Sequence, residues 1–425
     1  MTSRSTLCRG EGGRVHRSLG EGGFTLTEML IASAIMITVT AGVFTVLNPA
    51  QGTFQAQPEA ADMQQRLRVA VDTLKKDLLM AGAGSYSGGS AGALYNYFAP
   101  VMPYRKGSVD DDPENGVYFR PDADGLGSTY ISVVYVPPTP AQTTVNKAMG
   151  GGNASEIDVE AQHNCGQSKH DQLCGFEEGM RVLIMDIDGS WDTVTLTQIQ
   201  PEALHLQHHS DLSSAYDSGN AIITQVATHT YYLKEDDDTD TYQLMHYDGD
   251  ETDVPVVDHV VKLLFEYFGD PAPPTLLPNK SLSDDTGPWT TYGPKPPVIS
   301  EDQTGWNDGE NCVFKVEDGA QVPRLDSLSG DTVQVRLDPS ILDGSDEDDR
   351  GAWCPNAGTD NRFDADLLRI RRIRVTRRVQ VALAALRGPA GLLFARGGTS
   401  TSTERWVPDQ EIKFDVTPRN MNLGR

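Results

Sequence analysis

Four cysteines have the clearest chemistry in this sequence, and all follow a long apolar segment near the amino terminus: Cys165, Cys174, Cys312 and Cys354. An even number of cysteines in an oxidising compartment is typical of disulfides. We expect two bonds, Cys165 with Cys174 closing a short loop and Cys312 with Cys354 stapling a later segment. Four cysteines nevertheless allow three pairings.

Two short segments combine histidines with other metal-binding side chains. The first contains His163, Cys165, His170 and Cys174. Its spacing matches no standard zinc finger, and oxidising surroundings favour the disulfide. The second contains His205, His208, His209 and Asp211. The leucines that alternate with polar residues at its start favour a strand end and a solvated turn over a metal site.

Aspartate-rich turns recur along the chain, and clustered carboxylates are the ligands that calcium prefers. None of them has the 12-residue order of an EF-hand loop that closes with glutamate. Exposed hairpin turns account for most of them. Asp236, Asp238 and Asp240 are the best candidates for one structural calcium, and no other cofactor is expected.

Ser90 stands between glycines in the order of a nucleophile elbow, G-x-S-x-G. That chemistry requires a strand before the serine and a helix after it, whereas Ser90 lies in a glycine- and serine-rich linker. The sequence contains no zincin motif, phosphate loop or dinucleotide fingerprint. It therefore favours no enzyme activity.

The formal net charge of −25 over 425 residues argues against a nucleic-acid partner, which would require a basic contact face. One basic stripe, RIRRIRVTRRVQVAL from Arg369, stands against this background. As a strand it would turn Ile373, Val375, Val379 and Val381 inward and Arg374, Thr376, Arg378 and Gln380 outward. We expect its arginines to contact the protein's own acidic loops or a partner subunit.

The candidate residues above all follow an amino-terminal segment that is predicted to anchor the chain in a membrane. Residues 24–47 form a mostly apolar run with a single charge, Glu28, and as a helix they span about 36 Å, enough to cross a membrane. Residues 1–23 are net positive, which places the body after the span outside the cytoplasm. Pro49 should bend or interrupt the helix. The apolar spacing of residues 59–80 predicts that an amphipathic helix then resumes.

Beyond residue 93, short segments alternate apolar and polar residues between turn residues, as half-buried antiparallel strands do. The predicted strands are 117–120, 130–136, 156–160, 180–185, 192–199, 221–230, 242–247, 333–337 and 411–416. Residues 254–268 form either a strand pair or a short helix running into a strand, and we favour a turn followed by a strand at 261–268. Residues 270–365 are predicted to form a proline-rich, acidic insertion. The expected fold class is α+β, with the long helix packed on an antiparallel sheet.

Glu28 is informative because a carboxylate inside a membrane span costs about 2.5–3.5 kcal/mol unless it has a partner or a role. If the chain were cut after Gly23, the free α-amino group of Phe24 would lie about one helical turn before Glu28. A neighbouring subunit's terminal ammonium could then neutralise this carboxylate. Alternatively, Glu28 extends to the headgroups and suits the positive end of the helix dipole.

The segment GFTLTEML, residues 23–30, with the apolar helix behind it, resembles the class III signal of type IV pilins and pseudopilins. The resemblance implies that a prepilin peptidase cuts after Gly23 and methylates Phe24, and that Glu28 guides packing among other pilin subunits. Cleavage would also remove Cys8. The leader is long, and Gly22 and Glu21 stand where the family more often has a basic residue.

Residues 61–84 and 407–425 are similar to PilW-like minor pilins. The resemblance implies a leader at 1–23, a transmembrane and amphipathic helix at 24–82, and a β-rich exported domain at 93–425. It implies a structural protein for pilus assembly at or near the filament tip, held in the bacterial inner membrane with its body in the periplasm and then at the cell surface. The alternatives are a minor pseudopilin of a type II secretion system and a tip adhesin or ligand-binding module.

Overall fold

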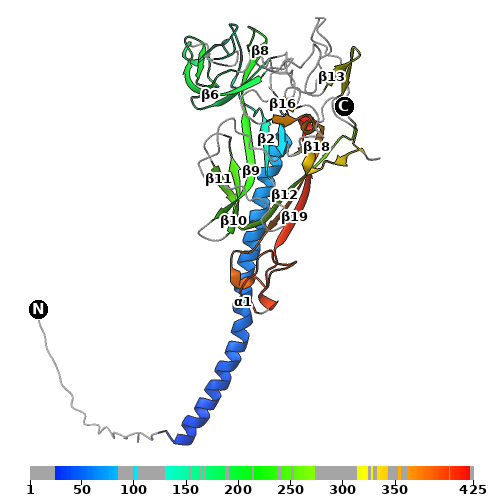
Figure 1. Cartoon of the computed structure of the whole chain (residues 1–425). Coiled ribbons are helices and arrows are strands. Elements are labelled where there is room, and N and C mark those ends of the chain that lie inside the picture. Colours follow the sequence, from blue (N-terminus) through cyan, green and yellow to red (C-terminus); the bar gives the residue numbers. More distant parts are fainter. Residues whose placement is uncertain are drawn as a thin grey trace, which may run out of the picture. The chain divides into compact units, whose positions relative to one another are not determined.

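The structure is a computed structural model (Figure 1). It describes residues 24–84, 99–103, 130–152, 155–162, 165, 169–186, 191–212, 215–236, 241–249, 253–272, 314–323, 327–328, 333–342, 353–355, 362–401 and 403–421. The chain divides into two compact units, Met1–Gln57 and Pro58–Arg425.

Helix α1 extends from Leu26 to Met80 without interruption. The helix is therefore not interrupted at Pro49, and the alternative expectation of a bend there stays a prediction. A proline inside a helix removes one backbone hydrogen bond, and the long runs of intact hydrogen bonds on either side can accommodate that loss.

The second half of α1 buries one face in the body, as the apolar spacing predicted. The buried side chains on this face are Met63, Leu67, Ala70, Leu74 and Leu78. The helix ends at Met80, and Gly82 just beyond it has a φ of 78°, the left-handed conformation that favours glycine. The Gly82 N–H donates to the Val134 carbonyl over 3.0 Å, and the Val136 N–H donates to Ala83 over 2.8 Å. These bonds join the end of the helix directly to a strand.

Among its described residues the body contains three larger antiparallel sheets and two hairpins, and the fold class is α+β, as predicted (Figure 1). The five-stranded sheet has the order β1 (Val101–Pro103), β2 (Ile131–Tyr135), β9 (Ala227–Asp236), β10 (Thr241–Tyr247) and β11 (Asp253–Val257). The six-stranded sheet has the order β3 (Gln142–Thr144), β8 (Ala221–Gln225), β5 (Arg181–Asp186), β6 (Trp191–Gln200), β7 (His205–His208) and β4 (Glu156–Asp158). The four-stranded sheet has the order β15 (Val335–Arg336), β12 (Val260–Gly269), β18 (Ile370–Val379) and β19 (Gln410–Val416).

Shorter elements connect these sheets. Two hairpins are formed by β13 (Phe314–Glu317) with β14 (Ala320–Pro323) and by β16 (Trp353–Pro355) with β17 (Arg362–Asp364). Helix α2 covers Pro339–Leu342, and 3-10 turns lie at Lys169–Asp171, Ala365–Arg369, Ala384–Leu386, Thr403–Arg405 and Arg419–Met421. Within the segment expected to be an insertion, β15 pairs with β12 and so extends the four-stranded sheet.

Two strand predictions are corrected. The single strand expected at 221–230 is divided at Val226 into β8 and β9, which belong to different sheets. Residues 254–257, expected to form a turn, belong to strand β11, and the reversal into β12 falls at His259, which has a φ of 56°. Apolar alternation continues through both junctions, so it does not mark where the chain changes sheet. The strand predicted at 117–120 lies outside the described residues.

The arginines of β18 pair with the protein's own acidic residues, one of the two partners expected for them. Arg372 and Arg374 contact Asp415 at 2.6 and 2.8 Å, and Arg378 contacts Asp409 at 2.9 Å. Thr376 and Gln380, which were predicted to face outward, are buried.

Arg377 faces the interior with the apolar residues of β18, and burial lowers its pKa to about 9. Its guanidinium has no hydrogen-bond partner among the described residues.

Candidate functional site

The amino-terminal unit presents an exposed apolar helix. Residues Leu26–Thr45 form the one helical segment in the described part of the chain that is long and apolar enough to cross a membrane. Its large side chains, such as Ile31, Met36 and Phe44, are more than half exposed in the isolated chain. Exposed apolar surface of this extent is consistent with a membrane anchor or a signal helix.

Glu28 lies in the first turn of this helix and is bonded to Thr25. The Thr25 N–H and hydroxyl donate to Glu28 Oε2 over 2.9 and 2.8 Å, and the Glu28 N–H donates back to Thr25 Oγ1 over 3.3 Å. This reciprocal pair is a capping box, which satisfies free N–H groups at a helix start. The sequence signal, threonine followed three residues later by glutamate, was present but not used. Phe24 is exposed, whereas Gly23 lies outside the described residues.

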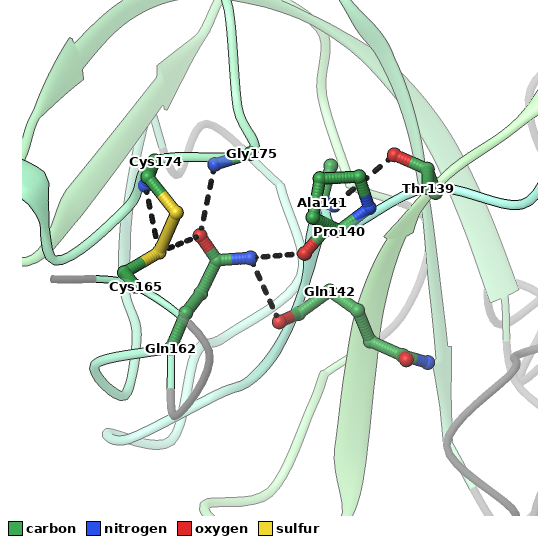
Figure 2. The surroundings of a disulfide bond; sticks show 8 residues. All are labelled: Thr139, Pro140, Ala141, Gln142, Gln162, Cys165, Cys174 and Gly175. Atoms are coloured by element: carbon green, nitrogen blue, oxygen red, sulfur yellow. Dashed lines mark hydrogen bonds between the residues drawn. A yellow bond between two sulfur atoms is a disulfide. The ribbon is translucent and has the colours of Figure 1, made fainter.

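The disulfide expected between Cys165 and Cys174 is present (Figure 2). It excludes the alternative zinc site, because sulfurs joined to each other cannot serve as thiolate ligands. Cys312 lies outside the described residues, and so does the side chain of Cys354, so the second predicted bond stays a prediction. Ser90, Asp238, Asp240 and the side chain of Asp236 also lie outside the described part of the chain.

Gln162 fixes the loop that the disulfide closes (Figure 2). Its Nε2 donates to the carbonyls of Pro140 and Gln142 over 2.5 and 3.1 Å, and its Oε1 accepts from the Gly175 N–H over 3.1 Å. A Cβ at Gly175 would come within 2.5 Å of the Ala141 nitrogen, so only glycine fits beside this strand. The disulfide region is a structural support for the six-stranded sheet.

The histidines at 205–209 do not converge on one site. His205 contacts Glu156 through Nδ1 and Asp158 through Nε2, whereas His208 is buried in the sheet and His209 is exposed. The solvated turn expected for this segment is therefore wrong for His208, because its side chain belongs to strand β7. Alternation along a strand sends neighbouring histidines to opposite faces.

A buried polar cluster lies between α1 and the five-stranded sheet. Asp77 of α1 is only 6% exposed, although it is a carboxylate. The Tyr135 hydroxyl donates to its Oδ1 over 3.0 Å, and the Tyr231 hydroxyl donates to its Oδ2. Burial, followed by the charge of Asp77, raises the pKa of both tyrosines, so they remain hydrogen-bond donors at all physiological pH values.

Two histidines complete this Asp77 cluster. His229 Nε2 lies 3.0 Å from the Tyr135 hydroxyl, and His229 Nδ1 lies 2.5 Å from His246 Nε2. The two rings stack with centroids 4.7 Å apart. Burial lowers the pKa of both imidazoles, so the neutral forms prevail at neutral pH. Asp77, His229 and His246 together offer three ligand atoms that lie within 4.8 Å of one another.

The sequence did not point to this cluster. Asp77 stood on the polar side of an amphipathic helix, and the two histidines are single residues within ordinary strand patterns. Their approach results from the register of β9 with β10, which pairs Tyr231 with His246, and from the docking of α1. One available signal was the position of Asp77 directly beside Leu78 on a helix whose apolar face includes Leu74 and Leu78.

Comparisons of the chain with protein-family models, with curated proteins and with solved structures gave no match.

Proposed function

We propose that this protein is a minor pilin-like structural subunit. Its amino-terminal segment is cut by a prepilin peptidase after Gly23. The apolar half of α1 then anchors the chain in the inner membrane, with the body in the periplasm, and later packs among the helices of other subunits. The body caps or primes a type IV filament at or near its tip.

One observation carries this proposal. Leu26–Thr45 is a fully exposed apolar helix with a single acidic residue in its first turn, and the same helix continues into a half that packs within a β-rich body. The capping box gives Glu28 a local role in any helix, but a charge this close to an apolar span is costly in lipid unless it also gains a partner. A subunit that exchanges lipid for neighbouring helices can use it.

The first test is mass spectrometry of the amino terminus of the mature protein. A chain that begins at methylated Phe24 supports the proposal, and an uncut leader contradicts it. Cell fractionation then compares sheared surface filaments with the inner membrane. We expect the protein in both, and its absence from the filament fraction would argue against assembly.

A second test separates the two roles open to Glu28. Glu28→Gln keeps an oxygen that can accept from the Thr25 N–H, so it preserves the capping box but removes the charge. If Glu28 pairs with a terminal ammonium, we expect incorporation into filaments to fall at least about tenfold. Asp72→Asn, at an exposed acid of the same helix, serves as the control and should incorporate normally. Normal incorporation of Glu28→Gln would reduce Glu28 to a helix cap.

A further inference from the structure

The Asp77 cluster has the composition of a transition-metal site. Its three potential ligands come from three elements, α1, β9 and β10, and they converge although they are distant in the sequence. One carboxylate and two imidazoles are suitable ligands for divalent first-row transition-metal ions. Calcium and magnesium prefer oxygen ligands and bind imidazole poorly. His205 is different, because its Nδ1 contacts Glu156 and its Nε2 contacts Asp158 on the other side of the ring, so these groups do not converge on one point.

The hydrogen bonds around the cluster already select the tautomer that a metal requires. Two imidazole nitrogens 2.5 Å apart must share a proton or a cation, since two lone pairs would repel. The simplest arrangement has His246 Nε2 donating to His229 Nδ1, while His229 Nε2–H donates to Tyr135 and the Tyr135 hydroxyl donates to Asp77. A metal ion would replace the shared proton, and that proton would move to His246 Nδ1. Every other bond would stay as it is.

The surroundings also have the form expected around bound metal. A metal-ligating histidine usually donates its second N–H to an oxygen, and a ligating carboxylate is itself hydrogen-bonded. His229 has Tyr135 in that position, and Asp77 has Tyr135 and Tyr231. Ligand atoms of a tetrahedral ion at about 2.0–2.1 Å lie about 3.3 Å apart. The two imidazole nitrogens are 2.5 Å apart and all three ligand atoms lie within 4.8 Å of one another, so the nitrogens would have to separate by about 0.8 Å to hold the ion.

We propose that Asp77, His229 and His246 bind one divalent first-row metal ion, best matched by zinc, which fastens the last turns of α1 to strands β9 and β10. Three protein ligands leave one tetrahedral position to an exogenous oxygen. The site is independent of the filament proposal, since it would stabilise the body whatever the protein assembles with.

The test uses the full-length protein in mild detergent, freed of metal with a chelator and then dialysed. Titration with Zn²⁺ should show one saturable equivalent and a raised unfolding temperature, and Ca²⁺ should produce neither effect. Co²⁺ should give visible bands typical of tetrahedral nitrogen and oxygen ligation. Absence of saturable Zn²⁺ binding, or equal protection by Ca²⁺, would overturn the proposal. These measurements on the unmodified chain stand even if a variant fails to fold.

Variants then locate the site. His229→Gln and His246→Gln should each weaken Zn²⁺ binding at least 100-fold. Tyr231→Phe, which removes a donor to Asp77 and no ligand, should weaken it about 10–100-fold. His208→Gln is the control, because His208 is also a strand histidine, is more deeply buried than His229 and His246, and lies outside the cluster. Zinc binding that persists in His246→Gln, at His205 or another surface histidine, would refute the assignment.

Discussion

Glu28 and Asp77 are acidic residues of the same helix with opposite surroundings. Glu28 is exposed, and the hydrogen bonds described for it join it to Thr25 in its own turn. Asp77 is buried and accepts from Tyr135 and Tyr231, which are 58 and 154 residues away in the chain. The first carboxylate belongs to a local structure that forms with the helix itself. The second has partners only once the sheet has folded.

The two parts of α1 therefore differ in what their side chains contact. The segment Leu26–Thr45 is exposed among the described residues, and under the proposed function lipid or other subunits would cover it. The segment from Met63 to Leu78 is completed inside the body, where apolar contacts and the Asp77 bonds hold it. Substitutions in the two segments should therefore change different measurements.

Asp77→Ala should have the largest effect on the body. Each of two buried tyrosine hydroxyls would lose its acceptor, and an unsatisfied buried donor costs about 1–3 kcal/mol. We expect a loss of about 2–6 kcal/mol in the free energy of unfolding on this basis. Urea unfolding in detergent, followed by tryptophan fluorescence with chelator present, measures the hydrogen-bond contribution without metal.

The control for Asp77→Ala is Asp72→Ala, an exposed aspartate five positions earlier on the same helix. A surface substitution of this kind should stay within about 0.5 kcal/mol of the parent. Equal destabilisation by both variants would show that loss of charge on α1, and not loss of the tyrosine bonds, is responsible.

The comparison also explains what the sequence could predict. The apolar helix, the amphipathic face, most strands and the Cys165–Cys174 bond were predicted, because each depends on a period or a spacing within a few residues. The Asp77 cluster could not be predicted, because no local pattern in the sequence shows which turn of the helix lies against which strand residue. The division at Val226 and the burial of Thr376 were missed for the same reason: sheet membership is set by distant partners.

Removing the disulfide should rank second. Cys165→Ser with Cys174→Ser opens a loop with a sequence separation of 9, and the chain-entropy estimate for such a loop is about 2–3 kcal/mol. The bond lies in the body, so urea unfolding should report this loss. Dithiothreitol should destabilise the parent more than the double variant, in which only the predicted Cys312–Cys354 bond is left to reduce. A parent insensitive to reductant would show that the loop is held by Gln162 alone.

Acid should destabilise the body through its buried neutral histidines. Burial lowers the pKa of His208 below its usual value near 6.5, with Asp192, His209 and Asp211 as charged neighbours. The unfolded chain therefore binds a proton that the folded body excludes. This contribution to stability is complete above about pH 6.5 and is lost as the pH falls through the folded pKa, at up to about 1.4 kcal/mol per pH unit.

His208→Gln tests this pH response. The difference between parent and variant in unfolding free energy should change between pH 7 and pH 5, with the parent losing more stability on acidification. His209→Gln, at the exposed neighbouring position, should follow the parent at both pH values. Parallel pH curves for His208→Gln and the parent would contradict the assignment.

Glu28→Ala should have the smallest effect on the body. The substitution removes the capping box at the start of α1. Loss of a helix cap costs about 0.5–2 kcal/mol of helix stability, so the first turn of the helix is weakened. That turn lies in the unit Met1–Gln57, so the urea midpoint of the body should be unchanged. The same variant should lose incorporation into filaments if the charge acts between subunits. A fall in the midpoint like that of Asp77→Ala would mean that the two halves of α1 unfold as one, and the division of roles along the helix would be wrong.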